Sequence, residues 1–577
     1  EIMPSLVGSE MCIRDRDKTM RNKYIVSYLL GSAFVLTSLS SCYDDESTLA
    51  TNKIDDITIS TDDDASTLYV SYLDELDVKP TIKRGTEQNV DGLAFKWEIS
   101  ELPNDINPEW IELSDEQDLH TVINNAISTM PYYLRYTVTD TKHGDLQSSK
   151  LWKVVVQSSF LDGIVVSDTK DGSSSDLNLI MSKNLTVNYS NREDKVVTQI
   201  LEKANHKPFD QLMTKLTYNS QGHLNLTHEN TLWAVTDEGD AVLFNTKDYS
   251  KTSQLSEGGV VTYKPDGLKV TDIYTTNAQW LIMNTNQKLY SVNSTSVSNF
   301  GWYDAGGSLY PINNGVVALA SSANVGSQMI IWYDAEDGCF VYGDNGGRSI
   351  SYANDLASNT FFDPADSPNL SAIAAGQTSG TETPAFVMKD NATGNYAIYT
   401  FTRYQEGEYE YDDDWNIIGT ITPEVPASAK MRYEIPEAGK ALLDKAVSVF
   451  FAVDQSILYV ATANGIYSIN FAGSTAIVND IPVYTPSAGE TIAKAKLYCQ
   501  GAYMHDYSVV GKVEDGATVE ELPLNKKAVI VATQSDTYEG KISVVPMTQI
   551  GTGKLDATSA LTYSGFGKIL DFCTTAY

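Results

Sequence analysis

The sequence has few of the residues that build disulfide frameworks, metal sites and nucleic-acid surfaces. It contains five cysteines and six histidines in 577 residues. After Cys42 only Cys339, Cys499 and Cys573 remain, an odd and widely spaced set that excludes a disulfide framework and a close metal pair. Lys and Arg number 41 against 75 Asp and Glu, and the net charge is −34. This balance argues against nucleic acid as a partner, because such binding requires cations that neutralise phosphates.

Known catalytic motifs are also missing. The chain has no G-x-S-x-G nucleophile elbow, no H-E-x-x-H zinc motif, no complete P-loop and no sialidase Asp-box. His206, His223 and His228 are near one another in sequence, but their irregular spacing favours surface histidines over a zinc site. The sequence therefore predicts no enzyme, no cofactor and no metal site, although calcium at the acidic segments 168–176 and 411–416 stays an open question.

The N-terminal region has the order of a secretory signal. Basic residues at 20–23 precede an apolar run at 24–36, which is followed by small residues. The run is shorter than the about 20 residues that span a bilayer. The tetrapeptide Leu-Ser-Ser-Cys that ends at Cys42 resembles the lipobox of bacterial lipoproteins, in which cleavage before the cysteine exposes it to acylation. This resemblance implies a signal peptide at 20–41 and attachment to the outer membrane through the acylated Cys42.

A run of acids follows that cysteine. Its members are Asp44, Asp45 and Glu46. They resemble the acidic export tag of surface lipoproteins of Bacteroidetes, which implies display on the cell surface. Two alternatives stay open: an ordinary signal with an incidental cysteine, and an acidic tether at 42–56 without an export role. The segment 1–19 precedes the natural start at Met20 and resembles a translated sequencing-adapter frame, so we expect it to be a non-native leader.

Short segments that alternate apolar and polar residues fill 57–157. The clearest are LYVSYL, LAFKWEIS, YYLRYTVTD and LWKVVVQ. Such alternation predicts antiparallel strands, and about a hundred residues of them predict one β-sandwich. The segments at 95–99, 133–140 and 154–156 resemble the PKD-like domains of Bacteroidetes lipoproteins, which implies an Ig-like sandwich. Trp97 is expected to fill its core.

From 158 to 577 a strand–turn–strand unit recurs. The seven copies are GIVVSDTKDGSSSDLNLIM, LWAVTDEGDAVLFN, WLIMNTNQKLYSVN, IIWYDAEDGCFVYG, AFVMKDNATGNYAIYTF, LYVATANGIYSINF and VIVATQSDTYEGKISVVPM. Several copies start about fifty residues apart, which predicts a seven-bladed β-propeller; the repeats of the rival β-helix are shorter. Asn464-Gly465 and similar pairs are expected to supply positive φ angles at the turns.

Two further elements complete this expectation. The terminal segment KILDFC is predicted to pair with the strand at 164–167 and so close the ring. A helix is predicted at 192–205, where Val196, Ile200 and Leu201 share one face.

Aromatic residues are the candidate ligand contacts. The tetrapeptide Trp-Tyr-Asp-Ala occurs at 302–305 and again at 332–335, and a long acidic insertion at 402–439 carries further aromatics. Adjacent residues of a strand face opposite sides, so we expect one aromatic of each pair to face the channel or solvent, unless both pack between blades. The predicted ligand-binding set is Trp302, Tyr303, Trp332, Tyr333, Tyr409, Tyr411 and Trp415.

Taken together, the lipobox, acidic tag, sandwich and hairpin array resemble the PKD-like family lipoproteins of Bacteroidetes that accompany SusC/SusD-type uptake systems. The resemblance implies an all-β surface lipoprotein that binds a glycan or peptide nutrient beside a TonB-dependent outer-membrane importer. Two other classes stay open. A polysaccharide-degrading propeller enzyme would need a convergent cluster of reactive side chains at the channel mouth, and an adhesin or scaffold would need a large exposed apolar patch.

Overall fold

The computed structural model describes residues 56–575 apart from internal gaps. The gaps are 62–65, 87, 89, 129, 159, 188, 190–192, 220–229, 259, 261–265, 276–279, 287–288, 294–300, 303–316, 320–328, 345–349, 352–356, 379–382, 406, 415, 501–512, 515–516, 519–520 and 538. The regular structure of the described chain is mostly β-strand with little helix, which confirms the predicted all-β class. Within these residues no helix has the length and apolar character needed to cross a membrane.

Residues 56–158 form the N-terminal unit. Its strands are β1 (Ile57–Ser60), β2 (Thr67–Ser71), β3 (Glu75–Val78), β4 (Thr81–Arg84), β5 (Leu93–Ser100), β6 (Trp110–Ser114), β7 (Leu119–Val122), β8 (Tyr132–Asp140) and β9 (Leu146–Gln157). The main sheet has the order β2-β9-β8-β5-β6, and the pairs β1-β4 and β3-β7 lie outside it. Strands β2 and β9 pair in parallel, whereas the alternation had predicted antiparallel strands throughout.

Three aromatic side chains form the centre of this unit. Trp97 is fully buried and stacks on Tyr136, with the ring centroids 4.1 Å apart, and on Trp152 at 5.6 Å. The indole N–H of Trp97 donates a hydrogen bond to the Glu116 carbonyl at 3.1 Å. The expectation that Trp97 fills the core is confirmed.

Residues 163–575 form the sheet array. In its described part, seven successive sheets each contain four or five strands. In pairing order, the first sheet is β12 (Lys195–Val197), β11 (Asp176–Met181), β10 (Ile164–Thr169) and β42 (Lys568–Thr574), and the second is β13 (Met213–Asn219), β14 (Thr231–Thr236), β15 (Ala241–Asn245) and β16 (Lys251–Gln254). The third is β17 (Val270–Thr275), β18 (Trp280–Thr285), β19 (Leu289–Asn293) and β20 (Gly301–Trp302), the fourth is β21 (Val317–Leu319), β22 (Met329–Asp334), β23 (Cys339–Asp344) and β24 (Ile350–Ser351), and the fifth is β25 (Leu370–Thr378), β26 (Thr383–Asp390), β27 (Tyr396–Phe401) and β30 (Ala429–Glu434). The sixth is β31 (Ala446–Ala452), β32 (Ile457–Thr462), β33 (Gly465–Asn470) and β34 (Ile477–Val478), and the seventh is β35 (Glu490–Leu497), β38 (Ala528–Ser535), β39 (Gly540–Gln549) and β41 (Leu561–Phe566), with β40 (Lys554–Leu555) also paired to β39.

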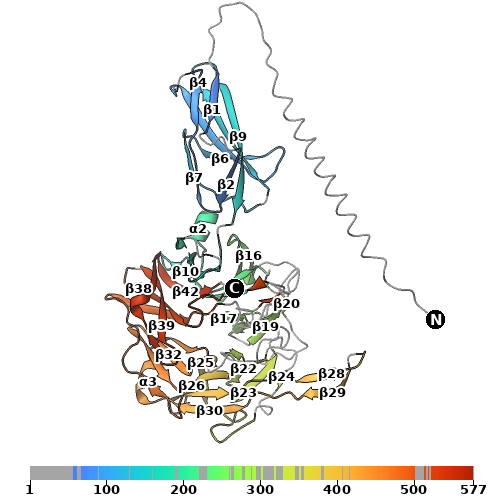
Figure 1. The fold of residues 1–577 in the computed structure, drawn as a ribbon, viewed down its shortest axis with the longest axis vertical. Coiled ribbons are helices and arrows are strands. Elements are labelled where there is room, and N and C mark those ends of the chain that lie inside the picture. Colours follow the sequence, from blue (N-terminus) through green and yellow to red (C-terminus); the bar gives the residue numbers. More distant parts are fainter. Residues whose placement is uncertain are drawn as a thin grey trace, which may run out of the picture.

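Smaller elements lie between these strands. They are the hairpins β28 (Glu408–Tyr411) with β29 (Ile417–Thr422) and β36 (Val513–Glu514) with β37 (Ala517–Thr518), the helices α2 (Ile200–Asn205) and α3 (Glu437–Leu443), and the short 3₁₀ turns Leu255–Glu257 and Ala557–Ser559. The β28–β29 hairpin extends outward from the lower part of the array in Figure 1.

The sheets follow one another around a common centre. In Figure 1 the colours run around the array in chain order, from teal through green and yellow to red. Edge strands of successive sheets contact one another at six places: β42 contacts β13, β13 contacts β17, β21 contacts β25, β25 contacts β31, β31 contacts β35, and β35 contacts β42. The first and last strands of the array pair directly, with Ile164 opposite Thr574 and Val166 opposite Phe572. The predicted pairing of the KILDFC segment with the strand at 164–167 is confirmed.

All seven predicted hairpins are present as the two middle strands of the seven sheets. Their sequences are apolar on both faces because a neighbouring sheet covers each side; every residue of β14 and of β32 is buried. The positive φ angles expected at the hairpin turns are present at Gly239 and Gly338, whose φ angles are 83° and 69°. Gly465 differs, since it begins β33 and is not among the residues with positive φ. A Cβ at that position would lie 3.0 Å from Pro482, so close packing explains this glycine.

The predicted helix at 192–205 is largely wrong. Only Ile200–Asn205 is helical, while Lys195–Val197 forms the edge strand β12 against β11. The apolar spacing of Val196, Ile200 and Leu201 suits one face of a helix. At the start of this segment, however, the backbone pairs with the open edge of β11 and forms a strand instead.

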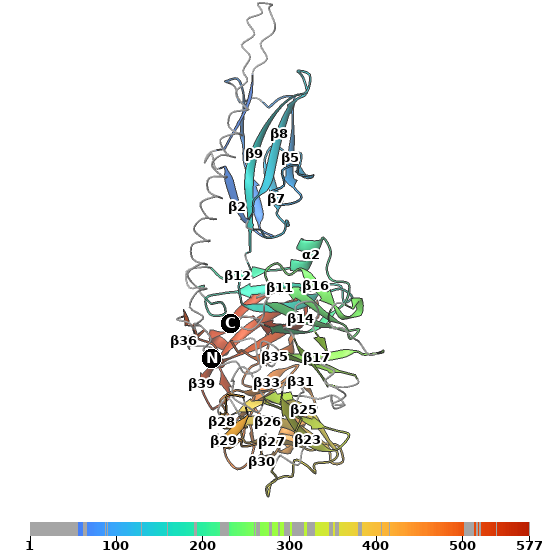
Figure 2. The same cartoon turned by 90° about the vertical axis from the view of Figure 1, so that its right-hand side faces the viewer.

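An aromatic contact joins the two parts of the chain, which lie one above the other in Figures 1 and 2. The ring of Phe160 meets Tyr72 of the N-terminal unit edge-on, with the centroids 5.9 Å apart, and Tyr249 of the array at 5.0 Å. Lys195 adds an ion pair to Asp74 at 3.0 Å. The hydrophobic core of the N-terminal unit therefore continues into the first two sheets of the array.

Candidate functional site

A pocket of about 420 Å³ lies among the inner edge strands of the array. Residues of β13, β17, β35 and β42 supply most of its lining, and Ala375 of β25 closes another side. Its polar lining includes Lys215, Thr217, Asp272, Thr275, Lys496 and Asp571. The pocket thus gathers side chains from strands that are hundreds of residues apart in sequence.

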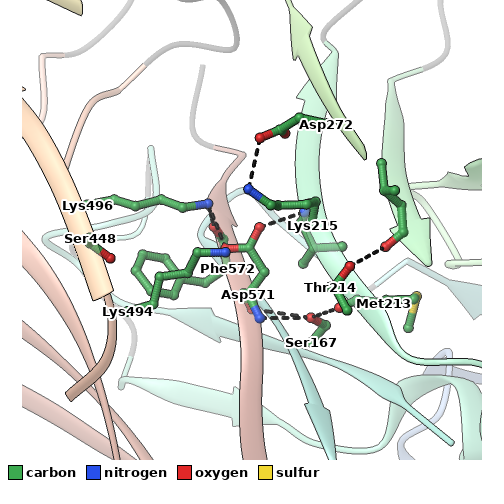
Figure 3. Close-up of polar contacts among 12 residues, drawn as sticks. Ser167, Met213, Thr214, Lys215, Asp272, Ser448, Lys494, Lys496, Asp571 and Phe572 are labelled. Carbon is green, nitrogen blue, oxygen red and sulfur yellow. Dashed lines mark hydrogen bonds and ion pairs between the residues drawn. The ribbon is translucent and has the colours of Figure 1, made fainter. Parts of the chain in front are cut away.

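Asp571 lies at the centre of the polar contacts drawn in Figure 3. Its backbone N–H donates to the Ser167 hydroxyl at 3.1 Å, and that hydroxyl donates to the Met213 carbonyl at 2.7 Å. One carboxylate oxygen, Oδ2, accepts a hydrogen bond from the backbone N–H of Leu216 at 2.8 Å. These bonds fix the carboxylate where β42, β10 and β13 meet.

Two lysines of β35 neutralise this buried carboxylate. The Nζ atoms of Lys494 and Lys496 lie 2.8 Å and 2.7 Å from the same Oδ1 atom of Asp571. The lysines are two residues apart, so they share one face of the strand. Burial alone would raise the pKa of Asp571, but the two ammonium groups outweigh burial and lower that pKa to about 2.

Lys494 and Lys496 differ in exposure. The side chain of Lys494 is 18% exposed and that of Lys496 36%. Burial lowers the pKa of Lys494 to about 8, with Asp571 opposing this shift and the neighbouring Lys496 and Lys215 adding to it. Lys496 also donates to the Phe572 carbonyl at 2.7 Å, and its ammonium lies 5.1 Å from the Phe572 ring centroid.

A third lysine approaches from the opposite side. Lys215 of β13 pairs with Asp272 of β17 at 2.8 Å. Burial would lower the pKa of Lys215, but the Asp272 carboxylate outweighs this and raises the pKa. In Figure 3 the side chains of Lys215 and Lys496 point toward each other across the region above Asp571.

The charges of this cluster do not cancel. Three ammonium groups, Lys215, Lys494 and Lys496, stand against the two carboxylates of Asp272 and Asp571, which leaves one positive charge. Burial keeps the nearby Cys573 thiol protonated by raising its pKa to about 12, so it is a poor nucleophile. Within the described residues, no group of three or more His, Cys, Asp or Glu side chains could hold a metal ion. The arrangement is suited to holding a charged solute.

The repeated aromatic pair at 332–335 is buried. Trp332 is 4% exposed and Tyr333 2%. They face opposite sides of β22, as the alternation predicts, but each side is covered: Trp332 packs with Leu289 and Val341, and Tyr333 with Phe340. The Tyr333 hydroxyl donates to the Ser367 carbonyl. The expectation that one of these two residues faces a ligand is wrong, because neighbouring sheets cover both faces.

The other aromatic candidates fall in different places. Tyr411 on β28 is 48% exposed, and Tyr409 on the same strand is half-buried over Gly407. Trp302 belongs to β20, although its side chain is outside the described part. None of Trp332, Tyr333, Tyr409 and Tyr411 lines the pocket. The predicted sites that lie outside the described residues are Tyr303, Trp415, Cys42, Asp44, Asp45 and Glu46.

The lysine and aspartate residues of the pocket were not predicted from the sequence. One available signal was the alternation Lys494-Ala495-Lys496 in an edge strand, because polar residues on one face of such a strand point toward the centre of the array. Asp571, between apolar residues of the closing strand, carries a similar signal.

Comparisons with known proteins add little. No protein-family profile matches the chain, and no curated protein matches its sequence. Among solved structures, it is similar to a complex of the fission yeast SREBP-SCAP binding domains, with 9% identity, 67% of this chain and 97% of that chain covered, and a TM-score of 0.31. It is also similar to U3-55K, with 10% identity, 62% and 84% covered, and a TM-score of 0.30. Sqt1 of Saccharomyces cerevisiae gives 11% identity, 67% and 97% covered, and 0.28. Scores this low carry no conclusion about fold or function.

Proposed function

We propose that this chain is a surface lipoprotein of the bacterial outer membrane that binds a nutrient ligand, a glycan or a peptide, as an accessory to a SusC/SusD-type TonB-dependent importer. In this proposal the N-terminal unit is a PKD-like, Ig-like sandwich and the sheet array is a seven-bladed propeller. The succession of seven sheets and the pairing of β10 with β42 support the propeller assignment.

The observation that carries the binding function is the pocket among the inner edge strands. Its volume of about 420 Å³ is in the range of small-molecule sites, about 300 to 1,000 Å³, and polar groups from several strands converge on it. The buried ion pairs of Asp571 hold these groups in place without a ligand. Such preorganisation favours binding because little side-chain freedom is lost when a ligand arrives.

A second contact surface is proposed on the β28–β29 hairpin. Tyr409 and Tyr411 lie on β28, and Ile418 and Ile421 of β29 are 60% and 62% exposed. The predicted Trp415 lies outside the described residues. Exposed aromatics stack on apolar sugar or peptide faces while they keep a polar edge in water. The hairpin would then contact the part of a long ligand that the pocket does not hold.

The test uses cells of the encoding bacterium that lack the chain, complemented with the wild type or with Cys42→Ala. Wild-type cells should retain labelled oligosaccharides or peptides at their surface and co-purify the chain with an importer. The Cys42→Ala cells should release the protein from the outer membrane and lose this retention, because acylation supplies the anchor. Equal retention by cells with and without the chain would refute the proposed function.

A further inference from the structure

We propose that the pocket recognises a carboxylate, so that the ligand is an acidic molecule held by Lys496 and Lys215. This inference rests on the proposed function because it specifies the chemistry of the same pocket. Two sources share that chemistry: the uronic acid of an acidic glycan and the free C-terminus of a peptide.

The first argument is the count of donors and acceptors. A lysine ammonium has three N–H donors. Lys496 directs one toward Asp571 and one to the Phe572 carbonyl, which leaves a third for a solute in the pocket that its side chain lines. Asp571 is already occupied, since Oδ1 meets two ammonium groups and Oδ2 accepts from Leu216. The pocket therefore has an N–H donor on Lys496 for which Asp571 offers no further acceptor, and a ligand oxygen can accept this hydrogen bond.

The second argument is the sign of the charge. The protein as a whole carries −34, so its general field repels anions. The cluster of Lys215, Lys494 and Lys496 against Asp272 and Asp571 has the opposite sign. The side chains of Lys215 and Lys496 are 38% and 36% exposed, so a solute can reach them. The surplus ammonium charge has no counter-charge among these five residues, so it attracts an anion that enters the pocket. A ligand carboxylate would supply that counter-charge.

The third argument concerns the kind of anion. One surplus positive charge matches a monoanion such as a carboxylate better than a doubly charged phosphate. Thr217 and Thr275 also line the pocket, and their hydroxyl oxygens lie 3.2 Å apart. The Thr275 hydroxyl donates to the Tyr218 carbonyl, so the Thr217 hydroxyl donates to Thr275, and both oxygens keep the capacity to accept a hydrogen bond from the neutral part of a sugar or peptide.

The experiment titrates the purified full-length lipoprotein in detergent with two matched pairs of probes, followed by ligand-observed NMR. The first pair is D-galacturonate and D-galactose, and the second is acetyl-dialanine with a free C-terminus and its amide. The charged member of at least one pair should bind more tightly by about tenfold or more, as expected for a charge-assisted hydrogen bond. The pair that shows this preference identifies the source of the carboxylate.

Variants then assign the preference to the pocket. Lys496→Met should abolish it and Lys496→Arg should retain it. Lys389→Met is the matched control, since Lys389 is 35% exposed and paired with Asp444 at 3.4 Å outside the pocket, and it should change nothing. If Lys496→Met fails to fold, the wild type still decides the matter, because added salt should weaken binding of the charged probe alone.

Two outcomes would overturn the inference. Equal binding of the charged and neutral members of both pairs would refute carboxylate recognition while leaving a ligand-binding function intact. Binding of none of the four probes would also refute it, whereas the proposed function is refuted separately, by equal retention in cells with and without the chain.

Discussion

Asp571 is the residue on which the electrostatics of the pocket depend. Replacing it with Asn leaves Lys494 and Lys496 without their counter-charge in a largely buried site. We expect Asp571→Asn to lower the free energy of unfolding by about 3 to 5 kcal/mol, the usual cost of breaking a buried ion pair. Denaturant unfolding at neutral pH measures this change.

The control for that variant is Asp454→Asn. Asp454 pairs with Lys526 at 3.2 Å, but its side chain is 41% exposed. Its loss should cost less than about 1 kcal/mol, because exposed ion pairs contribute little. Similar losses for the two variants would contradict the central role of Asp571.

Lys494, beside the pocket, makes the stability of the protein depend on pH. Its pKa is about 8 in the folded protein, against 10.5 for an ordinary lysine. Between these values the unfolded chain keeps a proton that the folded chain has lost, so this residue makes stability rise with pH. The groups facing it are Asp571 of β42, Lys496 of its own strand and Lys215 of β13.

The measurement compares the wild type with Lys494→Met in denaturant unfolding at intervals from neutral pH upward, so that titrating groups outside this cluster cancel. The stability of the wild type relative to the variant should increase as the pH rises from about 8 to about 10.5. A difference that stays constant across this range would contradict the lowered pKa.

At the scale of elements, the β28–β29 hairpin is expected to be dispensable for folding. Ile417, Ile418 and Ile421 are each more than half exposed, so replacing 408–422 with a short Gly-Ser turn removes little buried surface. The free energy of unfolding should change by less than about 1 kcal/mol. Retention of long ligands by whole cells should fall, while binding of small charged probes in the pocket stays unchanged.

A destabilised variant, measured by thermal unfolding, would show that the hairpin packs on the array. Unaltered ligand retention would withdraw Tyr409, Tyr411 and Trp415 from the proposed site. The double variant Tyr409→Ala with Tyr411→Ala separates the side chains from the hairpin backbone and should reproduce the loss of retention.

The elements themselves were largely predictable, and the reason is local. Each middle hairpin carries a continuous apolar pattern and a turn, and the closing strand is an isolated apolar segment at the end of the chain. The pocket was not predictable in the same way. Leu216 and Asp571 are 355 residues apart, and each looks like an ordinary strand residue until the array brings them together. The predicted ligand contact of Trp332 was wrong for a related reason, because a neighbouring sheet decides whether this side chain is exposed.

At the scale of the whole molecule, Phe160 couples the N-terminal unit to the array. Its side chain is 7% exposed between Tyr72 and Tyr249. Because Phe160 is a buried aromatic, Phe160→Ala should lower the free energy of unfolding by about 3 to 5 kcal/mol. We expect calorimetry to show a single coupled unfolding transition for the wild type and two separate transitions for the variant. A variant that still unfolds in one unchanged transition would contradict the coupling role of Phe160.

The pairing of β10 with β42 also determines when the molecule can be completed. Synthesis produces a chain from its N-terminus, and early domains fold first. The N-terminal unit can therefore fold while the rest is still being made. The strand at 164–169 has to wait for a partner that arrives about four hundred residues later, which at about 5 to 20 residues per second takes tens of seconds. During that interval its open edge is exposed to wrong partners, so a chaperone that holds unfinished chains would assist this protein at its first sheet.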